Sequence, residues 1–596
     1  MGRITTDNIK YFRTVNEFNS AYTGEEYIEP WVSYCTESAI TKFNKSMREK
    51  PLTFKIISAG TINWATNNTS YTRTIEYKKN NGEWTEITSN TGETAPTISV
   101  NNGDTVQFRG NNLDYADVNN HYNLFNSSTA KFEAEGNIMS LIDGVGYLTA
   151  TTLSHSYTFF RLFNMCTGLI CAENLILPAT TLVPNCYQYM FLDCTSLVTP
   201  PELPATTLAD WCYYSMFQGC TSLTTAPSLP ATTLANYCYQ YMFKGCSSLM
   251  STSELQATTL ANYCYGYMFS GCTSLIAAPS ILPATVLTEE CYTGMFAGCT
   301  NLTTAPELLA TELALRCCSY MFSGCRSLTI APALPATVLS PECYRQMFYG
   351  CTSLTTPPSI LPATVLSPEC YRQMFYGCTS LTSAPSLPAA TLAEGCYRNM
   401  FSNCTSLTTA PDLPATTLAN YCYYFMFYNC TSLTSAPSIL PATTLASGCY
   451  QQMFDGCTSL IITPTLPATT LAKYCYYYMF NGCTGLTTVL STLPATILAE
   501  RCYAQMFAGC KSLTTAPELP ATTLVDYCYY QMFRGCTNLN YIKCLATDIS
   551  ANYCTSDWVE SVQTNSGTFI KASTADWNSK TGYDGIPSNW TVQDAS

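Results

Sequence analysis

Charge is scarce in this chain of 596 residues, because Asp, Glu, Lys and Arg make up only 11% of it. The net charge of −13 argues against a nucleic-acid partner, which needs Lys and Arg to neutralise its phosphates. No run of 18 apolar residues is present, so we expect no membrane insertion. The first twelve residues, MGRITTDNIKYF, lack the apolar core of a signal peptide. The sequence therefore predicts folding in a cytoplasm.

Residues suited to catalysis are also few. The two histidines, His121 and His155, are too few to ligate zinc and too far from any distinctive cysteine to activate it. No glycine-rich phosphate loop occurs. Composition leaves a carboxylate pair for glycoside cleavage open, but the glutamates concerned fall at variable helix-start positions, where a capping or dipole role is simpler. They are Glu289, Glu290, Glu342, Glu369 and Glu394. We expect no enzyme activity, no cofactor and no metal site.

Apolar residues, by contrast, make up 47% of the chain, and they recur in one pattern from about residue 157 to 544. The clearest copy, residues 229–254, reads LPATTLANYCYQYMFKGCSSLMSTSE. After a first step of 28 residues, the second cysteine of each unit recurs every 26 or 27 residues. Its positions are Cys166, Cys194, Cys220, Cys246, Cys272, Cys299, Cys325, Cys351, Cys378, Cys404, Cys430, Cys457, Cys483, Cys510 and Cys536. A period this strict indicates a stacked array of about fifteen copies of one unit.

Each unit is predicted to hold a short helix and a short strand. Asn236 would cap the helix, Cys238, Met242 and Cys246 would form its apolar stripe, and Gly245 would end it. The segment that follows the helix, for example TSLTTAP at residues 221–227, is β-prone and closed by proline, which favours a short strand. One unit cannot bury its own apolar face, so neighbours must stack.

The motif MFxGCTSLT, with its PATTL return segment, resembles the BspA-like (Treponema-type) leucine-rich repeat over about two thirds of the chain. The resemblance implies an α/β repeat solenoid that serves adhesion or ligand recognition without catalysis. The Met-Phe pair, the second cysteine column and a longer unit depart from the family pattern and leave the curvature open. The arrangement of the whole chain is similar to proteins encoded by gut bacteria and their phages.

The two ends of the chain depart from the repeat. Five β-prone runs, with Asn81-Gly82 as a hairpin signal, predict a small all-β Ig-like domain before the array. These runs are residues 54–57, 74–77, 84–87, 97–100 and 105–108. The expected division is an anchoring arm at 1–50, an Ig-like β-sandwich at 51–135, a linker and capping repeat at 136–165, a leucine-rich repeat solenoid at 166–545 and a C-terminal cap at 546–596.

Cysteine is common, with 34 copies, of which thirty fall in two columns eight residues apart. A disulfide within a unit is not expected, because eight helical residues span about 12 Å and a bridge needs Cα atoms within about 7 Å. We interpret both columns as buried, reduced thiols that pack as small apolar groups. Only Cys35, Cys171, Cys318 and Cys544 lie outside them.

The informative positions are those that vary between units, namely the two residues after Cys-Tyr and the pair before the first cysteine. Tyr, Gln, Asn and Arg dominate these positions, a composition typical of binding loops, although an ordinary solvated face of a repeat is an equal alternative. We expect them to form an outward stripe. The candidate ligand contacts are Tyr214, Gln240, Tyr241, Tyr267, Arg345, Arg372, Tyr424, Phe425, Tyr477, Tyr478 and Tyr530.

The function expected from these features is non-enzymatic recognition or adhesion. The absence of a signal peptide favours a phage virion appendage, a fibre or receptor-binding protein that contacts a glycan or protein of the host surface. We expect a homo-oligomer that contacts other virion proteins through its N-terminal region. The alternatives are a bacterial cell-surface adhesin or glycan-binding protein, and a structural spacer or decoration protein of a virion.

Overall fold

The computed structural model describes residues 48–562, 566–580 and 582–595. The chain divides into two compact bodies, one within residues 1–205 and one within residues 206–596. The predicted anchoring arm lies almost wholly outside the described residues.

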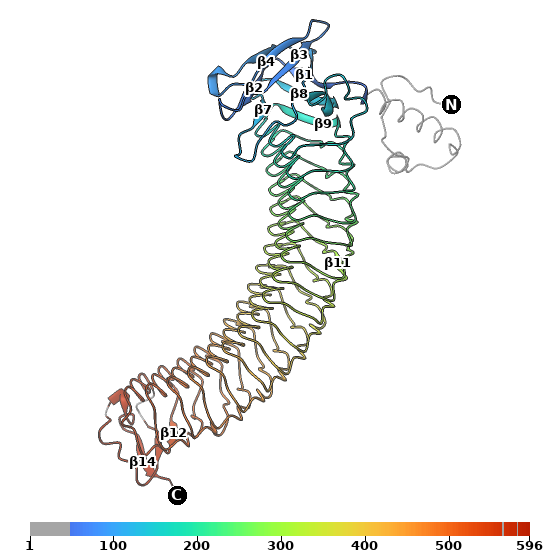
Figure 1. The fold of residues 1–596 in the computed structure, drawn as a ribbon. Helices are drawn as coiled ribbons and strands as arrows, with labels where there is room; N and C mark the ends of the chain where they lie inside the picture. The colour runs from blue at the N-terminus through green and yellow to red at the C-terminus, as the bar shows by residue number, and fades with distance from the viewer. Residues whose placement is uncertain (1–47, 563–565, 581, 596) are drawn as a thin grey trace, which may run out of the picture. The chain divides into compact units, whose positions relative to one another are not determined.

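The first body is built on two β-sheets (Figure 1). The larger has the strand order β4-β3-β6-β1-β8-β9 and the smaller the order β5-β2-β7. The strands are β1 (Leu52–Ser58), β2 (Gly60–Thr66), β3 (Thr74–Lys79), β4 (Thr85–Thr88), β5 (Thr97–Val100), β6 (Thr105–Arg109), β7 (Asn123–Asn126), β8 (Lys131–Asn137) and β9 (Leu169–Ile176), with 3-10 turns η2 (Gly92–Thr94) and η3 (Ile138–Leu141).

Aromatic rings join the two sheets of the first body. Phe125 of β7 lies 5.1 Å from Phe54 of β1 and 4.7 Å from Phe108 of β6, between ring centroids. All five strands predicted from the sequence are present, and β3 and β4 pair as a hairpin. The Ig-like topology, however, is not shown, because β1 lies between β6 and β8 inside the larger sheet instead of at an edge.

Strand β9 ties the first repeat to this sheet. It pairs in parallel with β8, and the Phe163 ring of the first unit lies 5.7 Å from Phe125. The first body extends to residue 205 and so includes the expected linker and the first repeat units, which the predicted division had placed in separate parts. The β-sheet covers the apolar end of the array, which is what a terminal cap must do.

The second body is a stack of coils, one coil per unit (Figure 1). The predicted helix is wrong: the described residues of the second body contain no α-helix. Its place is taken by a run of tight turns, in which alternate backbone N–H groups bond within the unit and to the next unit. Gln240 and Met242 donate to the carbonyls of Tyr237 and Tyr239, whereas Tyr241 donates at 2.9 Å to Gly266 of the next unit.

A left-handed residue at every fourth position produces this turn ladder. Tyr237, Tyr241 and Gly245 have φ of 59°, 58° and 76°. The buried residues Cys238, Met242 and Cys246 are four positions apart. A helix with these residues on one face would have the same spacing, so the sequence pattern does not separate a helix from the turn ladder. The turn ladder is favoured because about half of its own backbone N–H groups bond to the next unit, which the N–H groups of a helix cannot do.

Asn236 is therefore not a helix cap. Its side-chain oxygen accepts a hydrogen bond of 3.1 Å from the backbone N–H of Asn262, the equivalent residue of the next unit. Asp210 does the same for Asn236, and Asp526 for Asn552. As predicted, the side chain at this position accepts a hydrogen bond from a backbone N–H, but that N–H belongs to the adjacent coil.

The predicted strand in each unit is reduced to single parallel bridges, such as Thr225↔Ser251, Leu229↔Leu255 and Thr233↔Thr259. Prolines in the segments between the bridges have no N–H to donate, so the ladders stay short. Longer pairing occurs in β10 (Ile281–Leu282) with β11 (Glu307–Leu308), and at the C-terminal end.

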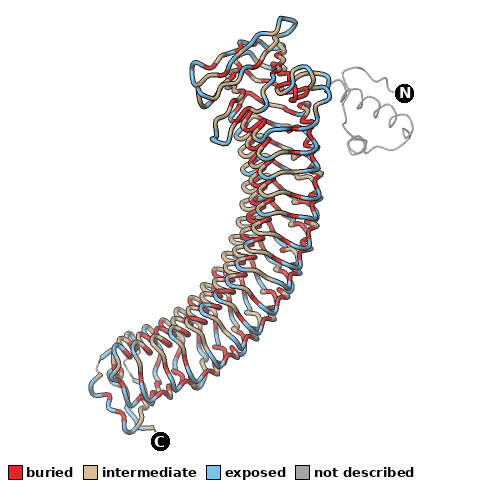
Figure 2. Tube along the Cα trace, viewed as in Figure 1, coloured by how far each residue is buried: buried red, intermediate tan, exposed pale blue. Residues whose placement is uncertain are grey.

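The core of the array consists of identical side chains stacked from unit to unit. Cys238, Tyr239, Met242, Phe243 and Cys246 are all at most 1% exposed, and buried positions recur in every coil (Figure 2). The Phe243 ring stacks at 5.5 Å on the equivalent phenylalanines of both neighbouring units. The predicted inward face and the burial of both cysteine columns are confirmed.

A parallel sheet of β12 (Tyr541–Cys544), β13 (Thr568–Lys571) and β14 (Thr591–Asp594), with the 3-10 turn η4 (Gly582–Asp584), ends the second body. Trp558 stands where other units have methionine. It is fully buried, stacks at 5.6 Å on Trp577, and donates its indole N–H to the carbonyl of Gly585 at 2.8 Å. Bulky indoles thus close the apolar end of the array, as expected for a cap.

Candidate ligand-binding face

The turn ladder presents three variable columns of side chains, which we call the turn face: the residue before the first cysteine, and the second and third residues after it. In the unit of residues 229–254 these are Tyr237, Gln240 and Tyr241. The first and third columns are left-handed in most units. Since each unit stacks on the next, every column places equivalent side chains side by side.

The eleven predicted contact residues all lie on this face, but none projects freely into solvent. Ten are half-buried, and Gln240 is only 7% exposed. They are less exposed than a helical stripe would be, because side chains of the turn face pack on one another and on the backbone of the neighbouring units.

The first aromatic cluster covers the beginning of the second body. Trp211 stacks on Tyr237 with ring centroids 4.0 Å apart, and Tyr237 stacks on Tyr263 at 4.7 Å. Beside them Tyr241 stacks on Tyr267 at 5.4 Å. The predicted contacts Tyr214, Tyr241 and Tyr267 are thus brought together, within a larger stack.

Two further clusters follow along the face. In the second, Tyr424 contacts Phe425 at 4.2 Å, and Tyr421 packs edge-on against Tyr424 at 5.8 Å. In the third, Tyr477 contacts Tyr478 at 4.3 Å and Tyr474 at 5.7 Å. The predicted contacts Tyr424, Phe425, Tyr477 and Tyr478 therefore belong to these two clusters.

Glycine makes room for these rings where it replaces a larger residue of a left-handed column. A Cβ on Gly448 would lie 2.6 Å from the Tyr421 ring, and a Cβ on Gly294 would lie 2.3 Å from the Tyr267 ring. Each tyrosine ring therefore packs closely against the backbone of the following unit. Both glycines are also left-handed, at φ of 59° and 57°.

Ion pairs separate the first and second clusters. Arg316 bridges Glu290 and Glu342 at 3.6 and 2.8 Å, and Arg345 and Arg372 pair with the glutamates three residues before them. The hydrogen bond from Arg316 holds the pKa of Glu342 below its usual value, whereas burial raises the pKa of Glu290. These glutamates neutralise arginines, so the predicted helix-dipole role is wrong.

Several residues of the turn face were not among the predicted contacts. They are Trp211, Tyr237, Tyr263, Arg398, Tyr421, Tyr474, Arg501 and Tyr527. Most occupy the column before the first cysteine, which varies as strongly as the others. The same criterion of variability, applied residue by residue in that column, would have found all of them except Arg398, which lies in the second column.

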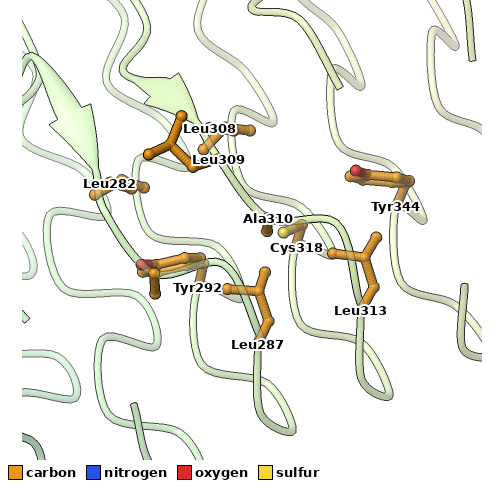
Figure 3. A pocket seen from close by; sticks show the side chains of 10 residues that line it. Leu282, Leu287, Tyr292, Leu308, Leu309, Ala310, Leu313, Cys318 and Tyr344 are labelled. Atoms are coloured by element: carbon orange, nitrogen blue, oxygen red, sulfur yellow. The ribbon is translucent and has the colours of Figure 1, made fainter. Parts of the chain in front are cut away.

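Two hollows lie elsewhere in the second body. One, of about 10 Å³, is apolar and lined by Tyr292, Leu309, Cys318 and Tyr344, among others (Figure 3). It occurs where Cys318 interrupts the buried tyrosine column, and it is at the lower limit for holding one water. The other, of about 660 Å³, is open and lies in the C-terminal cap beside Trp577 and Lys580.

The buried thiols are unsuited to nucleophilic or metal chemistry. Burial raises the pKa of Cys212 and of Cys264 to about 12, so both stay protonated at neutral pH. Within the described residues, no group of three or more His, Cys, Asp or Glu is placed to hold a metal ion. Nothing in that part of the chain forms a helix long and apolar enough to cross a membrane.

Stacked coils of a 26–27-residue unit with a fixed leucine and cysteine core define a leucine-rich repeat solenoid. The BspA type leucine rich repeat region matches residues 180–329, 292–433, 342–478 and 447–574, and the chain belongs to this family. No curated protein matches the chain. A leucine-rich repeat protein from Bacteroides ovatus is similar in structure, with 18% identity and a TM-score of 0.34 over 60% of this chain and 86% of that one.

Proposed function

We propose that this protein is a non-enzymatic recognition protein whose turn face binds an extended ligand, a polysaccharide or protein of a cell surface. One observation carries the proposal: the core columns stay constant from unit to unit, while the turn face varies and gathers half-exposed aromatic rings into three clusters. Aromatic rings offer large contact area at low entropic cost, and a row of them suits a ligand that is itself a chain of repeating groups.

The context that we propose is a virion appendage, a fibre or receptor-binding protein made in the host cytoplasm. Its support is the large number of buried thiols, since a chain that folds in an oxidising compartment exposes each of them to oxidation before burial. A homo-oligomer attached to other virion proteins through its N-terminal region would add avidity to weak contacts.

Two measurements test this function. Mass spectrometry of purified phage particles and of washed bacterial cells locates the protein, and we expect it on the particles. Purified full-length chain should bind intact host cells and compete with the particles for attachment. Detection on the bacterial surface instead would replace the virion appendage by an adhesin, and absence of any binding would leave a structural spacer.

A further inference from the structure

Three successive units carry an arginine in the second column of the turn face: Arg345, Arg372 and Arg398. The first two each have a glutamate three residues earlier, and both pairs are formed. In the third unit Gly395 stands at the glutamate position. Arg398 consequently forms no ion pair with any described residue. Its Nε lacks a hydrogen-bond partner, as do the Nε atoms of Arg345 and Arg372, so the missing ion pair is what distinguishes Arg398.

The carboxylates nearest in the sequence pattern do not compensate for the missing glutamate. Glu369 of the preceding unit accepts hydrogen bonds on both carboxylate oxygens from Nη1 of Arg372, at 2.9 Å. Glu394 is exposed and forms no ion pair within the described residues. A half-buried guanidinium that lacks an anion is costly unless a ligand supplies one.

Aromatic rings lie beside this guanidinium. Its central carbon lies 4.9 Å from the centroid of the Tyr424 ring, and Tyr421 packs edge-on against Tyr424. Tyr421 is 37% exposed and packs against Gly448, so part of its ring is open to solvent. A cation near a partly exposed aromatic ring matches a sugar that bears a carboxylate: the C–H groups of the sugar would contact the ring, and the carboxylate would meet the guanidinium.

We propose that Arg398, Tyr421 and Tyr424 form a subsite for an acidic sugar, a carboxylate-bearing residue of a polysaccharide that lies along the turn face. The proposal rests on the proposed function and specifies the chemistry of its ligand. In the two preceding units a glutamate of the same unit pairs with the arginine, so the guanidinium has no free position for a ligand carboxylate.

The test uses the full-length chain with polygalacturonate, a polymer of carboxylated sugars, and with its methyl-esterified, uncharged form. We expect salt-sensitive binding of the acid form and at least about tenfold weaker binding of the ester, since a charge-assisted hydrogen bond contributes about 1.5–3 kcal/mol. Equal binding of both forms, or no binding of the acid form, would overturn the subsite.

Two variants remove the anion site in opposite ways. Arg398→Gln removes the cation, and Gly395→Glu supplies the carboxylate that the preceding units have, in a left-handed position that Glu342 and Glu369 already adopt. Each should lower affinity for polygalacturonate about tenfold or more, while Arg326→Gln, an exposed charge off the turn face, should not. Unchanged affinity in either site variant contradicts the subsite. If both variants still bind cells, the proposed function stands even where the subsite is contradicted. Failure of the subsite can therefore be told apart from failure of the proposed function.

Discussion

At the scale of single residues, the thiols stabilise the stack through more than their size. The Cys246 Sγ donates a hydrogen bond of 3.1 Å to the carbonyl of Phe217 in the preceding unit, and the same bond recurs at Cys272 and in later units. That carbonyl also accepts the N–H of Cys220. A thiol at this position therefore gives a buried carbonyl a second hydrogen-bond donor from across the unit boundary, which alanine could not do.

The thiol columns predict alkaline sensitivity. Burial raises the pKa of Cys212, Cys264 and Cys299 from 9.0 to about 12, so between these values the unfolded chain loses protons that the folded chain keeps. Stability should be complete below pH 9 and fall as the pH rises toward 12. Thermal melts from pH 8 to 11 test this, and a constant melting temperature would contradict it.

The burial of the thiols also predicts low reactivity in the folded protein. Native protein should react with few equivalents of thiol reagent, and unfolded protein with nearly all 34.

The small cavity at Cys318 makes a paired prediction. Leu309 replaces the proline of the return segment in the unit where Cys318 replaces tyrosine, and both line the cavity. Because only about 10 Å³ is vacant, Cys318→Tyr alone should overpack the core and cost about 1–3 kcal/mol. Adding Leu309→Pro should recover most of that loss. Chemical denaturation of both variants measures the coupling, and additive effects would show that the two substitutions are independent.

At the scale of the element, the turn ladder is where inference from the sequence fell short. The repeat boundaries, the buried positions and five strands of the first body could be predicted, since they depend on period and hydrophobicity alone. The four-residue spacing of Cys238, Met242 and Cys246 fits a helix and a chain of left-handed turns equally well. What separates them is hydrogen bonding between units, and that depends on neighbours 26 residues away.

At the last left-handed position of the turn ladder, glycine is favoured by its backbone conformation and not by a lack of space for a side chain. Gly245 has φ of 76°, and a Cβ there would meet nothing closer than 3.9 Å. Gly245→Val should therefore cost about 1–2 kcal/mol or more through strain alone. Gly245→Asn should cost less, because Asn403 and Asn429 occupy the same column at φ of 61° and 57°. Equal unfolding free energies for the two variants would contradict the left-handed assignment.

At the scale of the whole molecule, each unit contacts its two neighbours, so a local loss of packing should spread along the array. Phe243 is fully buried between two stacked rings, and Phe243→Ala should cost about 3–5 kcal/mol. Hydrogen exchange should quicken first in the flanking units and only later toward the ends. A uniform increase in exchange across the second body, or an unchanged melting profile, would contradict nearest-neighbour stabilisation.

The candidate site could be predicted only in outline. Variation marked the right columns and named eleven residues that do lie on the turn face, but it could not show how far they pack on one another. The residue three positions earlier is Glu342 for Arg345 and Gly395 for Arg398, a difference that the sequence shows. That this residue pairs with the arginine follows only from the turn, which brings the two side chains together. Whether these residues contact a ligand stays a prediction.

The central claim is that recognition runs along the turn face, and ligand binding by a face variant tests it most directly. The variant replaces Tyr424, Phe425, Tyr477 and Tyr478 with Ser. Its control replaces four exposed threonines of the same two units, on another side of the coil, with Ala: Thr416, Thr417, Thr469 and Thr470.

The measurement is binding of each full-length protein to intact host cells, after melts confirm that both are folded. We predict that the control binds like the parent and that the face variant loses most of its binding. Undiminished binding by a folded face variant would contradict the claim and point to the first body or to the hollow beside Trp577.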